Sequence, residues 1–207
     1  MLGLDRSPGQ LEAEPRKRPM QARSVALVER VLDEAARLFE STGYHATTTN
    51  HVAEAAGVSV GSLYQYFPNK DALLVGLVER HLDEAVPAML ELAAGLRESQ
   101  PDAEQFAALV VGAVLDLNRS DQLHHLLWSA PRTAALDERL AAMEEVLVSE
   151  LTWHLQRLGH DDEVAAVRAQ LLSTVIDAAV HNIVSTHDRS DQERELQRLV
   201  TIYLASP

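Results

Sequence analysis

Hydroxyl-bearing and small side chains are concentrated in residues 47–74, which read TTTNHVAEAAGVSVGSLYQYFPNKDALL. The hydroxyls belong to three consecutive threonines, two serines and two tyrosines, and Lys70 adds one positive charge. Hydroxyls, a cation and the free backbone N–H groups of a helix start all bind phosphate oxygens, and the helix dipole favours the same anions. The segment therefore predicts a phosphate-binding surface.

Four helices are expected to position these hydroxyls. Apolar residues recur at helical spacing before the segment and after it, and glycine, serine, threonine and asparagine stand where helix caps are needed. The expected helices run from about Ser24 to Gly43, from Thr47 or Thr48 to Gly57, from Ser59 to Phe67, and from Asn69 onward.

Two short helices that meet across a glycine turn are typical of the helix-turn-helix, whose second helix enters the DNA major groove. Ala53, Ala56 and Gly57 are small enough for the two helices to cross closely. Gly61 costs about 1 kcal/mol relative to alanine inside a helix, which indicates that a partner such as DNA approaches its backbone. The positions expected to face outward are Ser59, Val60, Gly61, Ser62, Tyr64 and Tyr66.

Each of these residues also has a purely structural interpretation. Threonine and serine side chains can simply cap helices, and tyrosine rings can lie in a core. For a single residue neither interpretation is preferred, whereas the whole ordered set favours DNA binding.

The rest of the chain is predicted to be helical, which makes the protein all-α with about nine helices. Proline, glycine and polar clusters separate the later helices, and neither strand alternation nor a sequence repeat is found. The later helices are expected over about 102–119, 121–129, 133–158, 162–187 and 191–205. The expected division is a flexible basic arm over 1–21, a helix-turn-helix domain over 22–68 and a larger helical domain over 69–207.

Charge and composition limit the classes of function. The net charge is −13, yet residues 1–70 carry eight basic and eight acidic residues, and residues 71–207 carry ten basic and twenty-three acidic ones. The neutral first part is therefore compatible with DNA, and Arg16, Lys17 and Arg18 place a basic cluster in the arm. The chain has no cysteine and no apolar run of about 18 residues, so we expect a cytoplasmic protein with no membrane partner.

No catalytic motif is recognised in the sequence, so an enzyme is not expected, and neither is a cofactor. Asp177 and His181 stand four residues apart in a predicted helix, but a pair without a third ligand is weak support for a metal site. A helical scaffold that binds another protein is the other alternative, although it leaves residues 47–70 unexplained.

Residues 43–74, GYHATTTNHVAEAAGVSVGSLYQYFPNKDALL, resemble the N-terminal DNA-binding domain of TetR-type transcriptional regulators. The resemblance covers about residues 24–75 and implies a ligand-responsive regulator, most simply a repressor that binds a palindromic operator in double-stranded DNA. His51 and Val52 depart from the usual pattern. By this resemblance, the residues at the phosphates are Thr48, Thr49, Tyr64, Tyr66 and Lys70, with Thr47 beside them, and those at the bases are Ser59, Val60, Gly61 and Ser62, with Asn50 as a further candidate.

Palindrome reading requires a homodimer, because two reading heads must lie one helical turn apart on DNA. Apolar faces on the last two predicted helices are the candidate interface, in keeping with the resemblance, and the alternative is that they form intrachain core. The candidate interface residues are Leu171, Leu172, Val175, Ile176, Ala179, Leu196, Leu199, Val200 and Tyr203.

A small-molecule effector is expected to bind inside the larger helical domain and to lower DNA affinity by favouring one of two states of the dimer. Most apolar residues there will simply be core. The candidate ligand-binding residues are Leu117, Leu127, Trp128, Met143, Leu147, Asp177 and His181.

Overall fold

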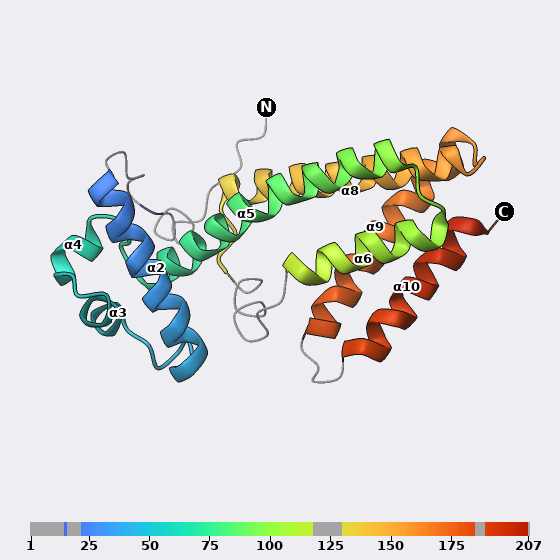
Figure 1. The fold of residues 1–207 in the computed structure, drawn as a ribbon. Coiled ribbons are helices and arrows are strands. Elements are labelled where there is room, and N and C mark those ends of the chain that lie inside the picture. Colours follow the sequence, from blue (N-terminus) through green and yellow to red (C-terminus); the bar gives the residue numbers. More distant parts are fainter. Residues whose placement is uncertain (1–14, 16–21, 118–129, 185–188, 207) are drawn as a thin grey trace, which may run out of the picture. The chain divides into compact units, whose positions relative to one another are not determined.

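The computed structural model describes residues 15, 22–117, 130–184 and 189–206. These residues form eight helices and no strand, which confirms the prediction of an all-α protein (Figure 1). The helices are α2 (Ala22–Thr42), α3 (Thr49–Ala55), α4 (Val60–Tyr64), α5 (Lys70–Ser99), α6 (Ala103–Leu117), α8 (Ala134–Arg157), α9 (Asp162–Val184) and α10 (Arg189–Ala205).

The predicted helices agree with these bounds to within a few residues, except that α4 ends at Tyr64 and not at Phe67. The expected helix over 121–129 and nearly all of the expected basic arm over 1–21 lie outside the described residues. The chain divides into two compact units: Met1–Leu82 with His125–Asp137, called here the first unit, and Asp83–His124 with Glu138–Pro207, called the second unit. The division falls inside α5, so the boundary at residues 68 and 69 stays a prediction of functional domains.

The first unit contains α2, α3, α4 and the start of α5. Two glycines with positive φ end its helices: Gly43 (φ 88°) closes α2, and Gly57 (φ 64°) makes the turn between α3 and α4. A third glycine is needed for space, because a Cβ atom on Gly76 would lie 2.9 Å from Cε1 of Phe67 and 3.2 Å from Cδ2 of Leu32. The backbone of α5 therefore lies close to both side chains.

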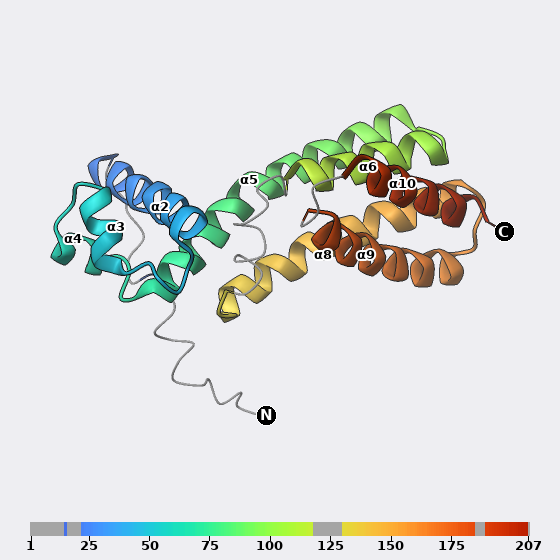
Figure 2. The same cartoon turned by 90° about the horizontal axis from the view of Figure 1, so that it is seen from below.

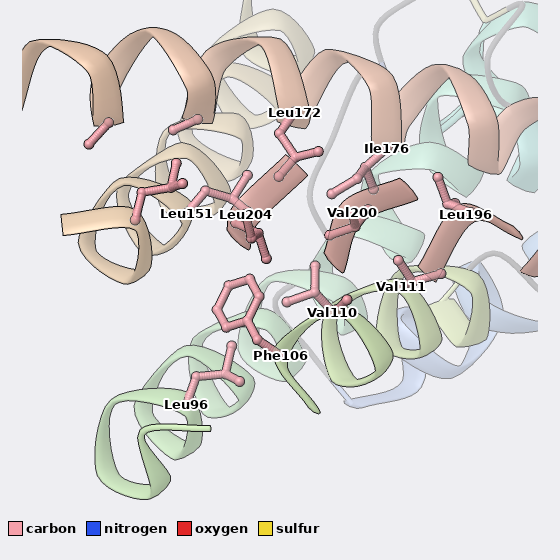
Figure 3. Close-up of a cluster of buried hydrophobic side chains, with 14 of the residues drawn as sticks. Leu96, Phe106, Val110, Val111, Leu151, Leu172, Ile176, Leu196, Val200 and Leu204 are labelled. Atoms are coloured by element: carbon pink, nitrogen blue, oxygen red, sulfur yellow. The ribbon is translucent and has the colours of Figure 1, made fainter. Parts of the chain in front are cut away.

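The second unit is held together by an apolar cluster from α5, α6, α8, α9 and α10. The cluster includes Phe106 and Leu151, which are fully buried, and α10 packs on both α6 and α9 (Figures 2 and 3). Figure 3 shows side chains of α6, α9 and α10 pointing toward one another from separate helices. Full burial of one large apolar side chain contributes about 1.5–3 kcal/mol, so this cluster stabilises the unit.

One polar side chain lies among these apolar ones. His154 of α8 is completely buried and stacks on Phe106, with 3.9 Å between the ring centroids. Burial, with the charge of Arg157 as a smaller cause, lowers the pKa of His154 to about 4, and Asp102 opposes this shift. The imidazole is therefore neutral at neutral pH.

Candidate nucleic-acid interface

Hydroxyls from two short helices meet at the start of α3. Thr48 is the N-cap of α3, and its Oγ1 accepts a hydrogen bond of 3.2 Å from the backbone N–H of His51. The hydroxyl of Thr49 shares a hydrogen bond of 3.0 Å with the hydroxyl of Tyr64 on α4. The structure thus brings three predicted phosphate-contacting residues into one polar surface.

The start of α4 is the next part of this surface. Ser59 is the N-cap of α4, and its Oγ accepts a hydrogen bond of 3.0 Å from the N–H of Ser62 and lies 2.7 Å from the Ser62 hydroxyl. Val60 and Tyr64 are each 39% exposed. Side chains of α4 are therefore available to a partner.

Gly61 is exposed, and no contact with the described residues requires a glycine there. Its φ is not positive, and the nearest atom to a Cβ built on it would be Oγ of Ser59 at an ordinary 3.9 Å. A poor helix former at this position is consistent with the predicted close approach of a partner, which stays a prediction. Asn50 and His51 on α3 are exposed as well.

The structure does not place two of the predicted contact residues at the surface. Thr47 is only 1% exposed, and its hydroxyl donates to the backbone oxygens of Gly43 (2.9 Å) and Leu38 (3.3 Å). Tyr66 is 7% exposed, so its expected outward position is wrong. Both residues therefore lie inside the first unit, in agreement with the structural interpretation of their side chains. A phosphate contact by either residue stays a prediction.

Lys70 has partners that the sequence did not reveal. Its Nζ donates hydrogen bonds to the backbone oxygens of Tyr44 (2.6 Å) and His45 (3.3 Å) and lies 4.2 Å from the centroid of the Tyr44 ring. The Tyr44 hydroxyl in turn donates to Oδ1 of Asp71. Tyr44 and Asp71 both lie within the segment that resembles TetR-type regulators, but twenty-seven residues separate them, so their spacing carries no signal of a contact.

The predicted ligand-binding residues are not brought together by the described residues. Met143 and Leu147 are half-buried on α8, and Asp177 is exposed on α9, contrary to the interior position expected for it. Leu127 and Trp128, and the side chains of Leu117 and His181, lie outside what the structure describes. The ligand site therefore stays a prediction, and no group of three or more possible metal-ligating side chains occurs among the described residues.

The predicted dimer interface separates into two sets. Leu172, Ile176, Leu196 and Val200 are buried in the apolar cluster of the same chain, so for these four residues the core interpretation is correct. Ala179 and Tyr203 pack against the cluster but are only partly buried, so an interface role for them stays a prediction.

The other three predicted interface residues, Leu171 (54%), Val175 (41%) and Leu199 (48%), are exposed. Val164 and Val167 of α9 and Ile202 of α10 are exposed too and were not predicted. Their helical spacing from Leu171 and Leu199 was the signal available in the sequence.

The sequence of this chain is similar to those of known proteins. Residues 31–77 match the family model of the tetR family of bacterial regulatory proteins. An uncharacterised HTH-type transcriptional regulator from Xanthobacter autotrophicus is 26% identical over 71% of this chain and 74% of its own length. The transcriptional repressor KstR2 from Rhodococcus jostii is 31% identical, over 47% of this chain and 50% of its own length.

The fold beyond the helix-turn-helix has counterparts as well. The transcriptional regulator FadR from Bacillus subtilis, solved in complex with stearoyl-CoA, has a TM-score of 0.60 over 86% of this chain and 97% of its own, at 22% identity. None of the helices in the described residues is long and apolar enough to cross a membrane. Residues 31–77 therefore match the tetR family of bacterial regulatory proteins, and the chain as a whole has a fold similar to that of a solved transcriptional regulator.

Proposed function

We propose that this protein is a homodimeric, ligand-responsive repressor that binds a palindromic operator in double-stranded DNA. The observation that carries the proposal is the surface of α3 and α4, where the hydroxyls of Thr49 and Tyr64 meet beside the Thr48 cap and the exposed Val60. Hydroxyls and helix-start N–H groups contact phosphates, and exposed side chains at the start of α4 contact base edges in the major groove.

The base contacts available to α4 are few. Val60 offers an apolar contact, which suits a thymine methyl group, and Ser59 and Ser62 hydrogen-bond to each other. We therefore infer that phosphate contacts supply most of the affinity and that α4 reads only a few bases directly. The basic arm over 1–21 is a candidate for shape readout in the minor groove.

The DNA proposal is tested by fluorescence anisotropy on duplexes that flank the protein's own gene. Thr49→Val removes one hydroxyl of the shared pair, and we expect it to weaken binding about tenfold, because a hydrogen bond to a charged group contributes about 1.5–3 kcal/mol. Thr152→Val is the matched control, since Thr152 is a half-buried helix threonine of α8, as Thr49 is of α3, and its hydroxyl donates to the backbone oxygen of Val148 (2.8 Å). Failure of the wild type to bind any duplex in a salt-sensitive way would contradict the proposal.

The exposed apolar face of α9 and α10 supports the homodimer. Leu171 and Val175 on α9 and Leu199 on α10 are exposed, although they belong to apolar types that are usually buried. We propose that this face packs on its symmetry mate to form a four-helix interface around a two-fold axis.

The dimer is tested by one charge placed on this face. Leu171→Asp is expected to convert the dimer to a monomer in sedimentation velocity and to weaken operator binding, because it buries a carboxylate in an apolar contact. Leu90→Asp on α5 is the matched control, since Leu90 is 52% exposed and Leu171 54%. If both variants sediment as the wild type does, the proposed interface is wrong.

An effector is the remaining part of the proposal. The likeness to a regulator solved with stearoyl-CoA supports a small-molecule ligand in the helical domain over 69–207, without indicating its chemistry for this chain. We infer that the effector binds better to the dimer state that does not fit the operator, and thereby releases DNA. A cytoplasmic site of action and the lack of an enzymatic activity belong to the same proposal. Screening a metabolite panel for compounds that lower operator affinity tests the effector step.

A further inference from the structure

The loop between α2 and α3 is tied to the first two residues of α5. Lys70 reaches back across this loop, and its Nζ donates to the backbone oxygens of Tyr44 (2.6 Å) and His45 (3.3 Å). An ammonium group has three N–H donors, so two of them are used inside the chain. The same ammonium lies 4.2 Å from the Tyr44 ring centroid, in reach of a cation–π contact.

Asp71 holds the tyrosine from its other end. The Tyr44 hydroxyl donates to Oδ1 of Asp71, and the Tyr44 ring also packs edge-on against Phe39 of α2, with 5.1 Å between centroids. Burial, then the hydrogen bond to Asp71 and its negative charge, raise the pKa of Tyr44 well above its ordinary value. The phenol therefore keeps its proton and remains the donor in this contact.

The far end of the loop is fixed by another set of bonds. Gly43 ends α2 with a left-handed φ, and the buried Thr47 hydroxyl donates back to the Gly43 oxygen. The next residue is Thr48, the N-cap from which α3 starts. Whatever holds Tyr44 and His45 therefore also determines where the first turn of α3 lies.

We propose that Tyr44, Lys70 and Asp71 form a clamp that positions the first turn of α3 for DNA. This inference rests on the proposed function. Loss of the bonds from the ammonium to the Tyr44 and His45 oxygens would loosen the loop that precedes Thr48. The three residues are positioning residues for the hydroxyls of Thr48 and Thr49.

Salt dependence separates the clamp from a phosphate contact. The probe is a duplex that the wild-type protein selects from a randomised DNA pool. Tyr44→Phe removes the hydrogen bond to Asp71 and leaves every charge in place, so we expect weaker binding with an unchanged slope of log K against log salt. A lost phosphate contact would instead reduce that slope by about 0.9 for each contact.

For Asp71→Asn, the clamp and simple electrostatics predict opposite changes in DNA affinity. Removing a carboxylate makes the protein less negative, so simple electrostatics predicts tighter DNA binding. The clamp predicts weaker binding, because Tyr44 loses its charged acceptor. Glu54→Gln is the matched control: it removes an exposed carboxylate from α3, outside the clamp, and is expected to bind DNA as well as the wild type or better.

Tyr44→Phe tests whether the contacts work as one unit. It should weaken binding at least as much as Asp71→Asn does, and the double variant should bind no more weakly than Tyr44→Phe alone, because both substitutions act on the same hydrogen bond. A readout without DNA is amide hydrogen exchange, which should become faster at His51 and Val52, whose N–H groups donate to Thr48, in each clamp variant and stay unchanged in Glu54→Gln.

Several results would overturn the clamp while leaving the proposed function intact. These are a reduced salt slope for Tyr44→Phe, tighter binding by Asp71→Asn, or unchanged exchange in the first turn of α3. Circular dichroism at the assay temperature shows that each variant is folded, and Tyr44→Phe, which removes one oxygen atom only, serves where Asp71→Asn does not fold. A wild-type protein that selects no duplex would overturn both the proposed function and the clamp.

Discussion

The first unit and the second unit use their polar side chains differently. In the first unit, Thr48, Thr49 and Tyr64 join short helices by hydrogen bonds at the surface, and the same hydroxyls are the proposed phosphate contacts. In the second unit, helices several turns long are joined by an apolar cluster, beside which the polar His154 is also buried. The stabilising hydrogen bonds of the first unit thus lie in its proposed recognition surface, whereas the core of the second unit is separate from its exposed apolar face.

This difference explains why the sequence predicted the local structure of the first unit in more detail than the packing of the second. Short helices of five and seven residues cannot be stable alone, so their caps, turns and small residues must stand at particular positions. Long amphipathic helices impose only a periodic pattern, which many arrangements satisfy. The following predictions test the contrast between the two units, beginning with the largest expected effect.

Removing one ring from the apolar cluster should damage the second unit most. Phe106→Ala empties the position against which His154 stacks, and we expect the free energy of unfolding to fall by about 3–5 kcal/mol. Urea denaturation followed by circular dichroism measures the change. Leu109→Ala, at a 47% exposed position of the same helix, should stay within about 0.5 kcal/mol of the wild type. Equal losses in the two variants would show that the cluster is not what holds the unit.

The buried histidine should make the second unit sensitive to acid. The pKa of His154 is about 4 in the folded chain, against 6.5 for an ordinary histidine, so the unfolded state binds the proton more readily. Its contribution to stability is therefore complete above pH 6.5 and is lost as the pH falls from 6.5 to 4, by up to a few kcal/mol.

His154→Phe is expected to remove this part of the pH dependence while keeping an aromatic ring beside Phe106. The measurement is the difference in unfolding free energy between wild type and variant at a series of pH values. A difference that stays constant from pH 7 to pH 4 would contradict the assignment of the acid sensitivity to His154.

In the first unit, the buried hydroxyl of Thr47 should affect the free energy of unfolding and not the salt dependence of DNA binding. Thr47→Val leaves the backbone oxygens of Gly43 and Leu38 without this donor, and we expect a loss of about 1–2 kcal/mol in the free energy of unfolding. The salt slope of DNA binding should not change, because the hydroxyl is buried. A lower salt slope of DNA binding with an unchanged free energy of unfolding would instead indicate that Thr47 contacts a phosphate.

The smallest effect is expected at Val60, at the exposed start of α4. Val60→Ala removes two methyl groups from an exposed side chain of α4, and we expect operator affinity to fall by about 1 kcal/mol or less with no change in stability. Base substitutions in the selected duplex identify the base pair at which wild type and variant differ. If that base pair contains thymine, the result supports a contact between Val60 and the thymine methyl group.

Local structure was predictable wherever neighbouring residues decide it. The caps at Thr48, Ser59 and Asn69 and the glycine turns at Gly43 and Gly57 are specified by backbone geometry within a few residues, and the structure has them. The all-α class follows from the same short-range signals. The long helices were likewise found to within a few residues, because their breaks coincide with proline, glycine and polar clusters.

Contacts between distant segments were not predictable. Tyr66 alternates with Tyr64 along the chain, yet one ring is buried and the other exposed. On α9, Leu171 and Leu172 are neighbours with opposite exposure, and the packing of α6 and α10 against α9 decides which of them is core.

By itself the sequence determined the helices, the caps and turns of the reading head, and the family to which they belong, because each of these depends on residues close in the chain. Tertiary structure alone decided that Thr47 turns inward, that Lys70 and Asp71 hold Tyr44, and that only part of the apolar face of α9 and α10 is free for a second copy. The physical reason is that burial and hydrogen-bond partners depend on which helix faces which, and periodicity within one helix carries no information about its neighbour.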